Sequence, residues 1–168
     1  MTPIESLIER YAAGSTLLAY AAGGIHDEKA RERPGPGRWS CAELVAHIVD
    51  SDLVDSDRMK RVIADEAATL LPYDENRWVA GLHSAEMPID AGLALFAANR
   101  AWTARILRAC DEAAFRRAGL HGERGRLTLA ELVAANVTHL DHHLRFLYGK
   151  RANLGISVQP RYLNSTID

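Results

Sequence analysis

The stretch Thr138-His139-Leu140-Asp141-His142-His143-Leu144 decides how this chain folds. It belongs to a run over residues 128–148 in which apolar side chains recur at helical spacing. Residues four apart lie one above the other on a helix, so His139 and His143 form a pair on one face. Two imidazoles at this spacing can bind one transition-metal ion. Because the pair shares its face with apolar residues, we predict that both rings point into the protein.

Composition places the chain among ordinary globular proteins. It has 168 residues, 48% of them apolar and 25% charged, which is enough for one domain with a substantial core. The formal net charge is -2, with 20 basic residues scattered among 22 acidic ones. This balance favours neither nucleic acid nor a membrane surface as a partner, so we expect a small-molecule substrate. The densest basic spot, Arg31 to Arg38, is interrupted by prolines and is predicted to be a solvated loop.

Cysteine usage and hydropathy indicate a compartment. Cys41 and Cys110 lie in helical runs without CxxC spacing, so we interpret them as buried free thiols in a reducing environment. The start of the chain lacks the pattern of a signal peptide. No apolar run approaches the ~20 residues that a membrane span needs. We therefore expect a cytoplasmic protein.

Helical periodicity and capping signals predict four long helices. Ser40-Cys41-Ala42-Glu43 and Thr128-Leu129-Ala130-Glu131 are both capping boxes, in which the first residue caps the helix and the glutamate reaches back to it. The helices are expected over residues 4–22, 40–68, 89–109 and 128–148.

The connections complete a predicted topology. Residues 25–39 are expected to form an irregular loop, and residues 70–87 a long crossover between the second and third helices that packs Tyr73 and Trp78. Residues 111–117 extend the third helix or form a separate turn, and residues 120–127 form a loop or a small hairpin. Residues 150–168 are expected as an extended or frayed tail. The prediction is an all-α four-helix bundle in a single domain, 1–168.

A third histidine completes a candidate metal site. His47 lies on the apolar face of the second helix, about seven residues or roughly 10 Å from its start. His143 lies within roughly 10 Å of the end of the fourth helix. If these helices are antiparallel, all three imidazoles reach one level of the bundle and leave an open coordination position, as in catalytic zinc sites. The alternative is two unrelated core histidines and a third placed by chance.

Five segments resemble the DinB/YfiT-like superfamily. The first is Trp39-Ser40 followed, after six residues, by His47-Ile48-Val49-Asp50-Ser51. The others follow in family order: Arg58-Met59-Lys60; Pro72-Tyr73-Asp74-Glu75 with Trp78; His121-Gly122-Glu123-Arg124-Gly125 before Leu127-Thr128; and His139-Leu140-Asp141-His142-His143 as HxxHH. Together they span residues 39–143. Each motif is weak alone, but the order and spacing of all five are specific.

The resemblance implies an atypical four-helix bundle that binds a divalent metal through His47, His139 and His143. Zinc and nickel suit these ligands, and iron(II) is compatible with them. Similar proteins include thiol S-transferases that use bacillithiol, mycothiol-dependent isomerases and candidate metal-dependent hydrolases. This chain departs from YfiT-type relatives at Asp52 and Phe146, where they have histidine, and both residues could shape the pocket.

Each residue that could assist the predicted metal site has two interpretations. Asp50, three residues after His47, could orient a ligand or act as a base, or it could be a solvated acid. Arg100 could bind an anionic thiol or a substrate carboxylate, or pair internally with Asp50 or Glu43. Arg58 has the same ambiguity.

The remaining candidates lie in predicted loops or away from the apolar faces of the predicted helices. His121 could line the mouth of the site for substrate or be an ordinary loop histidine. His142 faces away from the predicted ligands and is expected at the surface or in a supporting position behind a ligand. Trp39, with Tyr73, Trp78 and Trp102, is interpreted as core or helix-start packing rather than a stacking platform.

Three functional hypotheses follow. The first is a metal-dependent thiol S-transferase, which joins a low-molecular-weight thiol to an electrophilic small molecule. The second is a metal-dependent hydrolase. The third, from another class, is a non-catalytic metal-binding module of a stress response. The apolar helix faces also allow a homodimer.

Overall fold

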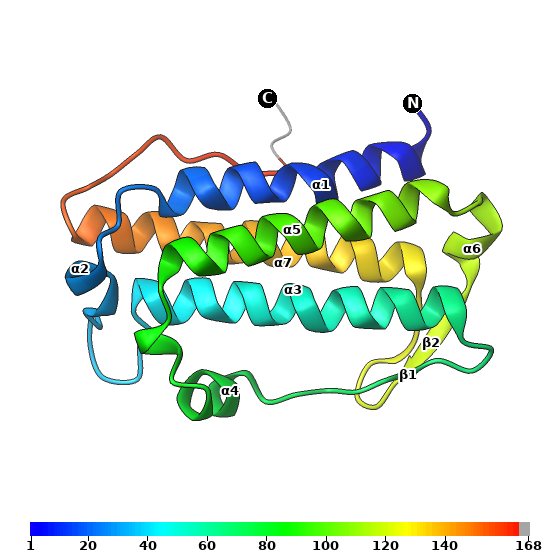
Figure 1. Ribbon diagram of the computed structural model, residues 1–168, viewed down its shortest axis with the longest axis horizontal. Helices are drawn as coiled ribbons and strands as arrows, with labels where there is room; N and C mark the ends of the chain where they lie inside the picture. The colour runs from blue at the N-terminus through cyan, green and yellow to red at the C-terminus, as the bar shows by residue number, and fades with distance from the viewer. Residues whose placement is uncertain (165–168) are drawn as a thin grey trace.

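The computed structural model describes residues 1–164, except the side chain of Asp27, and is built around four long helices (Figure 1). These are α1 (Pro3–Ala22), α3 (Cys41–Ala64), α5 (Ile89–Ala109) and α7 (Leu129–Asn153). The two expected capping boxes open α3 and α7. A third box, formed by Thr2 and Glu5, opens α1. The predicted four-helix bundle is therefore confirmed.

The order of the helices around the bundle explains the long crossover. Helices α1 and α3 each pack against both α5 and α7. In Figure 1, α3 and α5 run in the same direction, opposite to α1 and α7. Because α3 and its neighbour α5 are parallel, the chain between them must return along the length of the bundle. It does so through β1 (Thr69–Leu70), α4 (Glu75–Gly81) and the 3-10 turn η1 (Ser84–Glu86).

Helix boundaries differ from the sequence prediction at three places. Helix α3 ends at Ala64 rather than 68, because Asp65 is extended and the chain turns into β1. The expected loop 25–39 contains a short helix, α2 (Asp27–Arg31). Helix α7 passes through Gly149 and ends at Asn153, where Gly155 adopts a φ of 72°.

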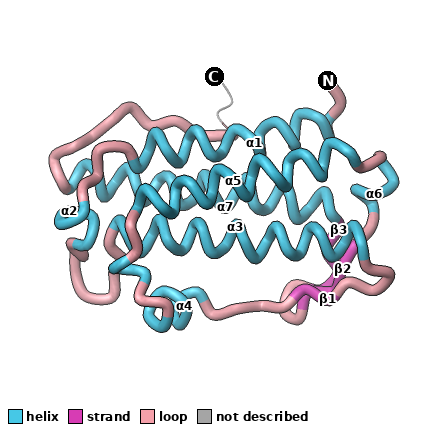
Figure 2. The backbone as a smooth tube through the Cα atoms, in the orientation of Figure 1, coloured by secondary structure: helices cyan, strands magenta, loops and turns pink. Residues whose placement is uncertain are grey.

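A small sheet lies beside one end of the bundle (Figure 2). The segment predicted as a loop or hairpin is a hairpin of β2 (Ala118–His121) and β3 (Gly125–Thr128). Strand β1 adds to it in parallel to β2, an addition that the sequence did not predict because β1 has only two residues. Before the hairpin, α6 (Glu112–Arg116) is a separate helix rather than an extension of α5.

The chain after α7 returns along the bundle as an extended strap. The carboxylate of Asp141, on α7, accepts hydrogen bonds from the backbone N–H of Leu163 at 2.7 Å and of Asn164 at 2.8 Å. The tail predicted for 150–168 thus begins only after residue 153, and residues 165–168 lie outside the described part of the chain.

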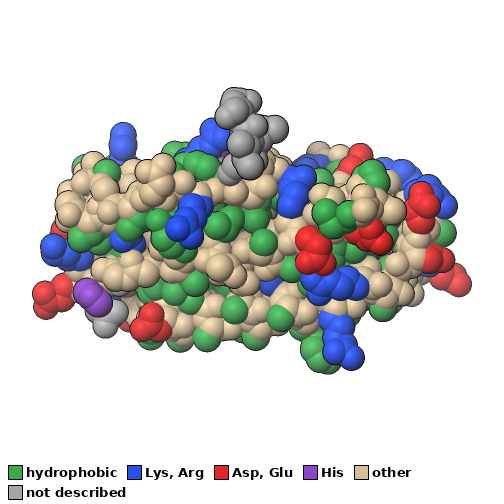
Figure 3. Space-filling model, turned by 90° about the horizontal axis from the view of Figure 1, so that it is seen from above, with side chains coloured by type: hydrophobic (Ala, Val, Ile, Leu, Met, Phe, Trp, Pro, Cys, Tyr) green, Lys and Arg blue, Asp and Glu red, His purple; other side chains and the backbone are tan. Residues whose placement is uncertain are grey.

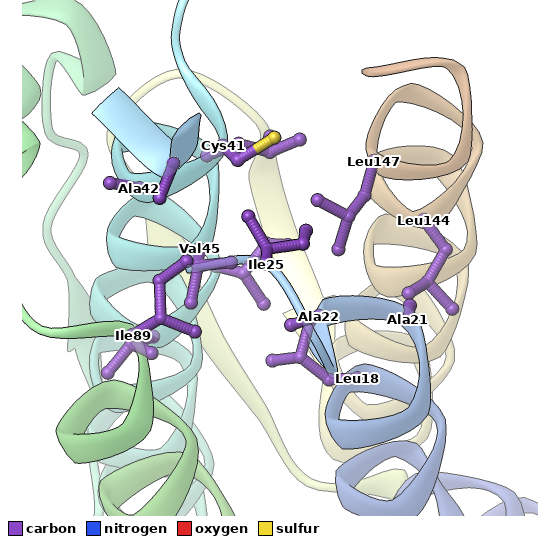
Figure 4. Packing of buried hydrophobic residues seen from close by; sticks show 14 of the residues in the cluster. Leu18, Ala21, Ala22, Ile25, Cys41, Ala42, Val45, Ile89, Leu144 and Leu147 are labelled. Atoms are coloured by element: carbon purple, nitrogen blue, oxygen red, sulfur yellow. The ribbon is translucent and has the colours of Figure 1, made fainter. Parts of the chain in front are cut away.

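The core contains an apolar part and a buried ion pair. Small and branched side chains from all four helices interlock at the end of the bundle shown in Figure 4, among them Leu18, Val45, Ile89 and Leu144. Toward the middle, the guanidinium of Arg100 lies fully buried and pairs with Asp52.

The structure shows how the surface charges are distributed and where the two cysteines lie. On the face shown in Figure 3, acidic and basic side chains are interspersed rather than gathered by sign. Both cysteines are free; Cys41 is buried and Cys110 is half-buried. None of the helices in the described residues is both long enough and apolar enough to span a bilayer.

Gly14 provides a stability test. A Cβ there would overlap the guanidinium of Arg100 and lie 2.7 Å from Cδ2 of Leu140. Arg100 cannot move aside because Asp52, Asn136 and the carbonyl of Tyr11 hold it. We expect Gly14→Ala to lower the free energy of unfolding by about 2 kcal/mol, the scale of an overpacked core, in a urea titration.

Gly149→Ala is the matched control, because a Cβ there meets nothing within 4 Å. It should raise the free energy of unfolding by about 0.5–1 kcal/mol through helix propensity. Equal effects of the two substitutions would contradict the packing described for Gly14.

Candidate metal centre

Three histidines from two helices meet inside the bundle. His47 projects from α3, and His139 and His143 project from α7. The Nε2 atom of His143 lies 3.1 Å from Nε2 of His47 and 3.0 Å from Nε2 of His139. One nitrogen from each ring falls in a group whose members are all within 4.8 Å of one another. His47 and His143 are buried, and His139 is half-buried.

The fold brings these rings to one level for simple reasons. Helices α3 and α7 are antiparallel neighbours, so a residue near the start of α3 faces one in the second half of α7 (Figure 1). The four-residue spacing on α7 stacks its two histidines on one face. Between them, Leu140 enters the core, whereas Asp141 turns to the strap.

The electrostatics of the group keep the imidazoles neutral. Burial, followed by the nearby His139, lowers the pKa of His47 to about 4. Burial, followed by the neighbouring His139 and His47, lowers the pKa of His143 to about 2. The pKa of His139 is also lowered, chiefly by burial. Neutral imidazoles at neutral pH have free lone pairs, which metal coordination requires.

The donor set fits a divalent transition metal. Zinc–nitrogen bonds of about 2.0–2.1 Å in a tetrahedral site place ligand nitrogens about 3.3 Å apart, close to the separations around His143. Each neutral imidazole carries one proton, on either Nδ1 or Nε2. Without an ion, these protons cannot provide hydrogen bonds for all three crowded Nε2 atoms and also for Nδ1 of His143, which is buried without a hydrogen-bond partner. A cation where the three nitrogens converge would satisfy all three lone pairs at once. Among the side chains that the structure describes, no fourth histidine, cysteine or carboxylate joins the group.

A pocket opens beside this group. Its volume is about 600 Å³, and His143 forms part of its wall. The segment before α3, the second half of α7 and Asn76 of α4 supply most of its lining. Trp39 lines it with its ring 4.8 Å from that of His47, and Phe146 lines it with its ring 6.1 Å from that of His143. A ligand in this pocket would therefore lie next to the three histidines.

One carboxylate approaches the histidines from the crossover. Glu75, in the first turn of α4, places Oε2 3.9 Å from Nε2 of His47, and its side chain is about half exposed. Asp50, expected to be the supporting acid, lies elsewhere: it lines two other cavities, neither of which includes a ligand histidine. Burial raises the pKa of Asp50. Glu75 belonged to a recognised motif, but only the path of the crossover shows that it reaches the site.

Arg100 does not face the pocket, which corrects its expected role in substrate binding. Its Nε donates to Asp52 at 2.9 Å and its Nη1 to the carbonyl of Tyr11 at 2.8 Å, and it also bonds Asn136. The internal ion pair is therefore with Asp52, not with Asp50 or Glu43. Asp52 shapes the bundle centre rather than the pocket, whereas Phe146, the other departure from the YfiT-type pattern, does line it.

Arg58, expected to bind an anion or to pair internally, and His121, expected at the mouth or as a loop histidine, both lie away from the pocket. Arg58 is buried, donates to Asp55 at 2.9 Å and bonds the carbonyl of Leu71, so it ties α3 to the crossover. His121 is buried in the hairpin, where its Nδ1 accepts from the backbone N–H of Glu123. Neither residue lines the pocket beside His143.

The predictions for His142 and for the aromatic side chains have different outcomes. His142 is exposed, as expected. Tyr73 and Trp78 pack together with ring centroids 4.6 Å apart. Trp102 is 65% exposed, so its expected core role is wrong; it stands off the apolar stripe of α5.

The lowered histidine pKa values predict a pH dependence. The unfolded chain protonates these histidines near their ordinary pKa of 6.5, whereas folded His47 stays neutral down to about pH 4 and His143 to about pH 2. Below 6.5 the unfolded state binds more protons, so stability is lost as the pH falls. For metal-free protein, the free energy of unfolding should fall by up to about 1.4 kcal/mol per pH unit for each such histidine.

Urea titrations at several pH values between neutral and about pH 4 measure this slope. His143→Gln should flatten it, whereas His142→Gln, at the exposed neighbour, should leave it unchanged. A slope that His143→Gln leaves intact would show that the ring is protonated when folded.

Comparisons with known proteins agree with this geometry. The family model of the DinB superfamily matches residues 11–147. Proteins of Oceanobacillus iheyensis and Geobacillus kaustophilus, both provisionally named as metal-dependent hydrolases, are 29% identical over 128 residues and 28% identical over 127. The alignments cover 76% and 75% of this chain and 74% and 71% of those proteins.

Two solved structures share the fold. YfiT from Bacillus subtilis, described as a probable metal-dependent hydrolase with an unusual four-helix bundle topology, has a TM-score of 0.85 at 22% identity, covering 94% of this chain and 91% of YfiT. A mycothiol-dependent maleylpyruvate isomerase has a TM-score of 0.71 at 16% identity, covering 87% and 61%. With a family match over most of its length, the bundle and the clustered histidines in place, this chain belongs to the DinB superfamily.

Proposed function

We propose that this protein is a metal-dependent enzyme that activates a low-molecular-weight thiol and transfers it to an electrophilic small molecule. His47, His139 and His143 would hold one divalent ion, zinc or nickel in the first instance and iron(II) as a compatible third. The observation that carries the proposal is the convergence of three neutral imidazoles beside a pocket of about 600 Å³. Ligand pockets in proteins have volumes of this order.

The chemistry required is activation of a nucleophile near neutral pH. A divalent ion held by three histidines lowers the pKa of a thiol or water that binds its open position. The absence of a fourth ligand from the described part of the chain favours such an open site over a sealed structural one. It therefore argues against the third hypothesis, a non-catalytic metal-binding module.

Residues around the histidines would orient the reactants and move the proton. Trp39 and Phe146 form apolar walls that limit the access of water to a ligand held beside His143. The carboxylate of Glu75, 3.9 Å from the imidazole of His47, can accept the proton that a bound thiol loses and return it to the product.

Two observations support the thiol over other nucleophiles. The pocket has room for a molecule of the size of a tripeptide, far more than a water molecule needs. The fold is shared with an isomerase whose name states its dependence on mycothiol.

Hydrolysis is the second candidate. The names of the relatives point to it, and Glu75 is placed to take a proton from a water molecule as readily as from a thiol.

Thiol binding to cobalt-substituted protein tests the proposal. Bacillithiol, mycothiol and glutathione are added in turn, and the visible spectrum is recorded. A thiolate that ligates the ion should produce a new sulfur-to-cobalt charge-transfer band with one of the three, because only direct sulfur ligation gives such a band. Loss of that thiol together with an electrophile such as monochlorobimane should then be faster with the holoenzyme than without it.

Glu75→Gln is the accompanying variant and Glu86→Gln, exposed in η1, its control. Glu75→Gln should retain the band and slow conjugation about 10²-fold, the usual contribution of a general base. A spectrum that none of the thiols changes would reject thiol transfer and favour hydrolysis.

A further inference from the structure

The wall of the pocket beside His143 carries positive charge without compensation. Arg38, from the segment before α3, and Arg145 and Lys150, from α7, all line it. None of its lining residues is acidic. None of these three cations forms an ion pair with a carboxylate among the described side chains.

Several other arginines of the surface form ion pairs. Arg61 pairs with Asp57 at 2.6 Å, and Arg108 pairs with Glu9 at 2.8 Å. Arg33, next to the pocket in sequence, pairs with Glu43. The cations of the pocket wall differ from these pairs in that they share a concave site whose lining contains no carboxylate to neutralise them. The basic spot predicted to be a solvated loop therefore contributes one side chain, Arg38, to a pocket.

Local contacts fix part of this wall. Lys150 is half-buried and donates a hydrogen bond to the carbonyl of Trp39, which leaves further N–H donors free. Arg145 lies over the ring of Tyr162, with Cζ 5.7 Å from the ring centroid. The wall is therefore partly organised before a ligand arrives, which reduces the entropy cost of binding.

The rest of the lining defines the other half of a ligand. Trp39, Leu44 and Phe146 are apolar, and Asn76 and Asn153 offer amide groups. His143 lies at the inner side and belongs to the three-histidine group. This combination suits a molecule with anionic groups at the outer wall and a less polar, reactive portion directed at His143.

We propose that this pocket binds a small organic anion bearing carboxylates, and that Arg38, Arg145 and Lys150 select it by charge. Guanidinium groups match carboxylates in a bidentate geometry, and the ammonium adds a point charge. The inference rests on the proposed function, because it names the chemical class of the molecule that the histidine centre acts on. It applies whether that molecule is the thiol or the substrate of hydrolysis.

Calorimetric titration with S-methylglutathione tests this proposal. The probe has two carboxylates and no free thiol, and its diethyl ester, which has none, is the matched ligand. Both are titrated into zinc-loaded and metal-free protein at low salt. The dicarboxylate should bind both protein forms at least about tenfold more tightly than the ester, the difference expected for charge-assisted hydrogen bonds.

The double variant Arg38→Gln/Arg145→Gln should lose at least about tenfold in affinity for the dicarboxylate and leave ester binding unchanged. Arg161→Gln is the control, because Arg161 also lies over a tyrosine ring, at 4.0 Å from Tyr20, but does not line the pocket. Inorganic phosphate, added as a competitor, should displace the probe only weakly.

Three outcomes overturn the proposal: no binding of the dicarboxylate at millimolar concentration, equal affinity for the ester, or full affinity in the double variant. Stronger binding of inorganic phosphate than of the probe would assign the wall to phosphate instead and overturn it as well. The titration of metal-free protein distinguishes a failure of the proposed metal centre from a failure of the pocket assignment. Dicarboxylate binding without any zinc uptake would reject the metal centre alone. Zinc uptake without dicarboxylate binding would reject only the pocket assignment.

Discussion

The antiparallel contact between α3 and α7 is the constraint on which the site depends. It sets His47 opposite His139 and His143 with neighbouring Nε2 atoms about one hydrogen-bond length apart. A slip of one residue along either helix would rotate a ring by about 100° and take it out of the group. The register is held by apolar packing, with Leu140 and Leu144 on α7 facing Leu44 and Ile48 on α3 in one continuous cluster.

A buried polar network next to this contact fixes the same helices. Arg100 of α5 pairs with Asp52 of α3, and Asn136 of α7 bonds both of them. Buried charges of this kind add little net stability, but removing one partner leaves the other uncompensated and costs about 3–5 kcal/mol. The network therefore acts against alternative packings of α3, α5 and α7, and Gly14 of α1 leaves the space that it needs.

Periodicity and capping were sufficient to predict the bundle, because both are local properties of helices. They placed the three histidines at one level only if α3 and α7 are antiparallel, and the family resemblance supplied the complete ligand set. The HxxxH spacing fixes two ligands on one face, and the position of His47 along its helix fixes the level of the third. The positions of side chains that depend on tertiary packing could not be predicted from local helix patterns. Asp50 lies three residues after His47, and Arg100 lies on the apolar face of α5, yet Asp50 lines other cavities and Arg100 faces the bundle centre. Glu75 and Arg38 reach the site from the crossover and the pre-helix segment, whose paths are set by tertiary packing.

The central claim is that three imidazoles from two helices hold one cation. Zinc titration with elemental analysis of untagged protein tests it most directly, using wild type, His47→Ala and His142→Ala, each checked for folding by circular dichroism. The account predicts one zinc per chain for wild type and His142→Ala, and at least about 100-fold weaker binding for His47→Ala, since only two ligands remain. A folded His47→Ala protein that keeps one zinc at full affinity would contradict it.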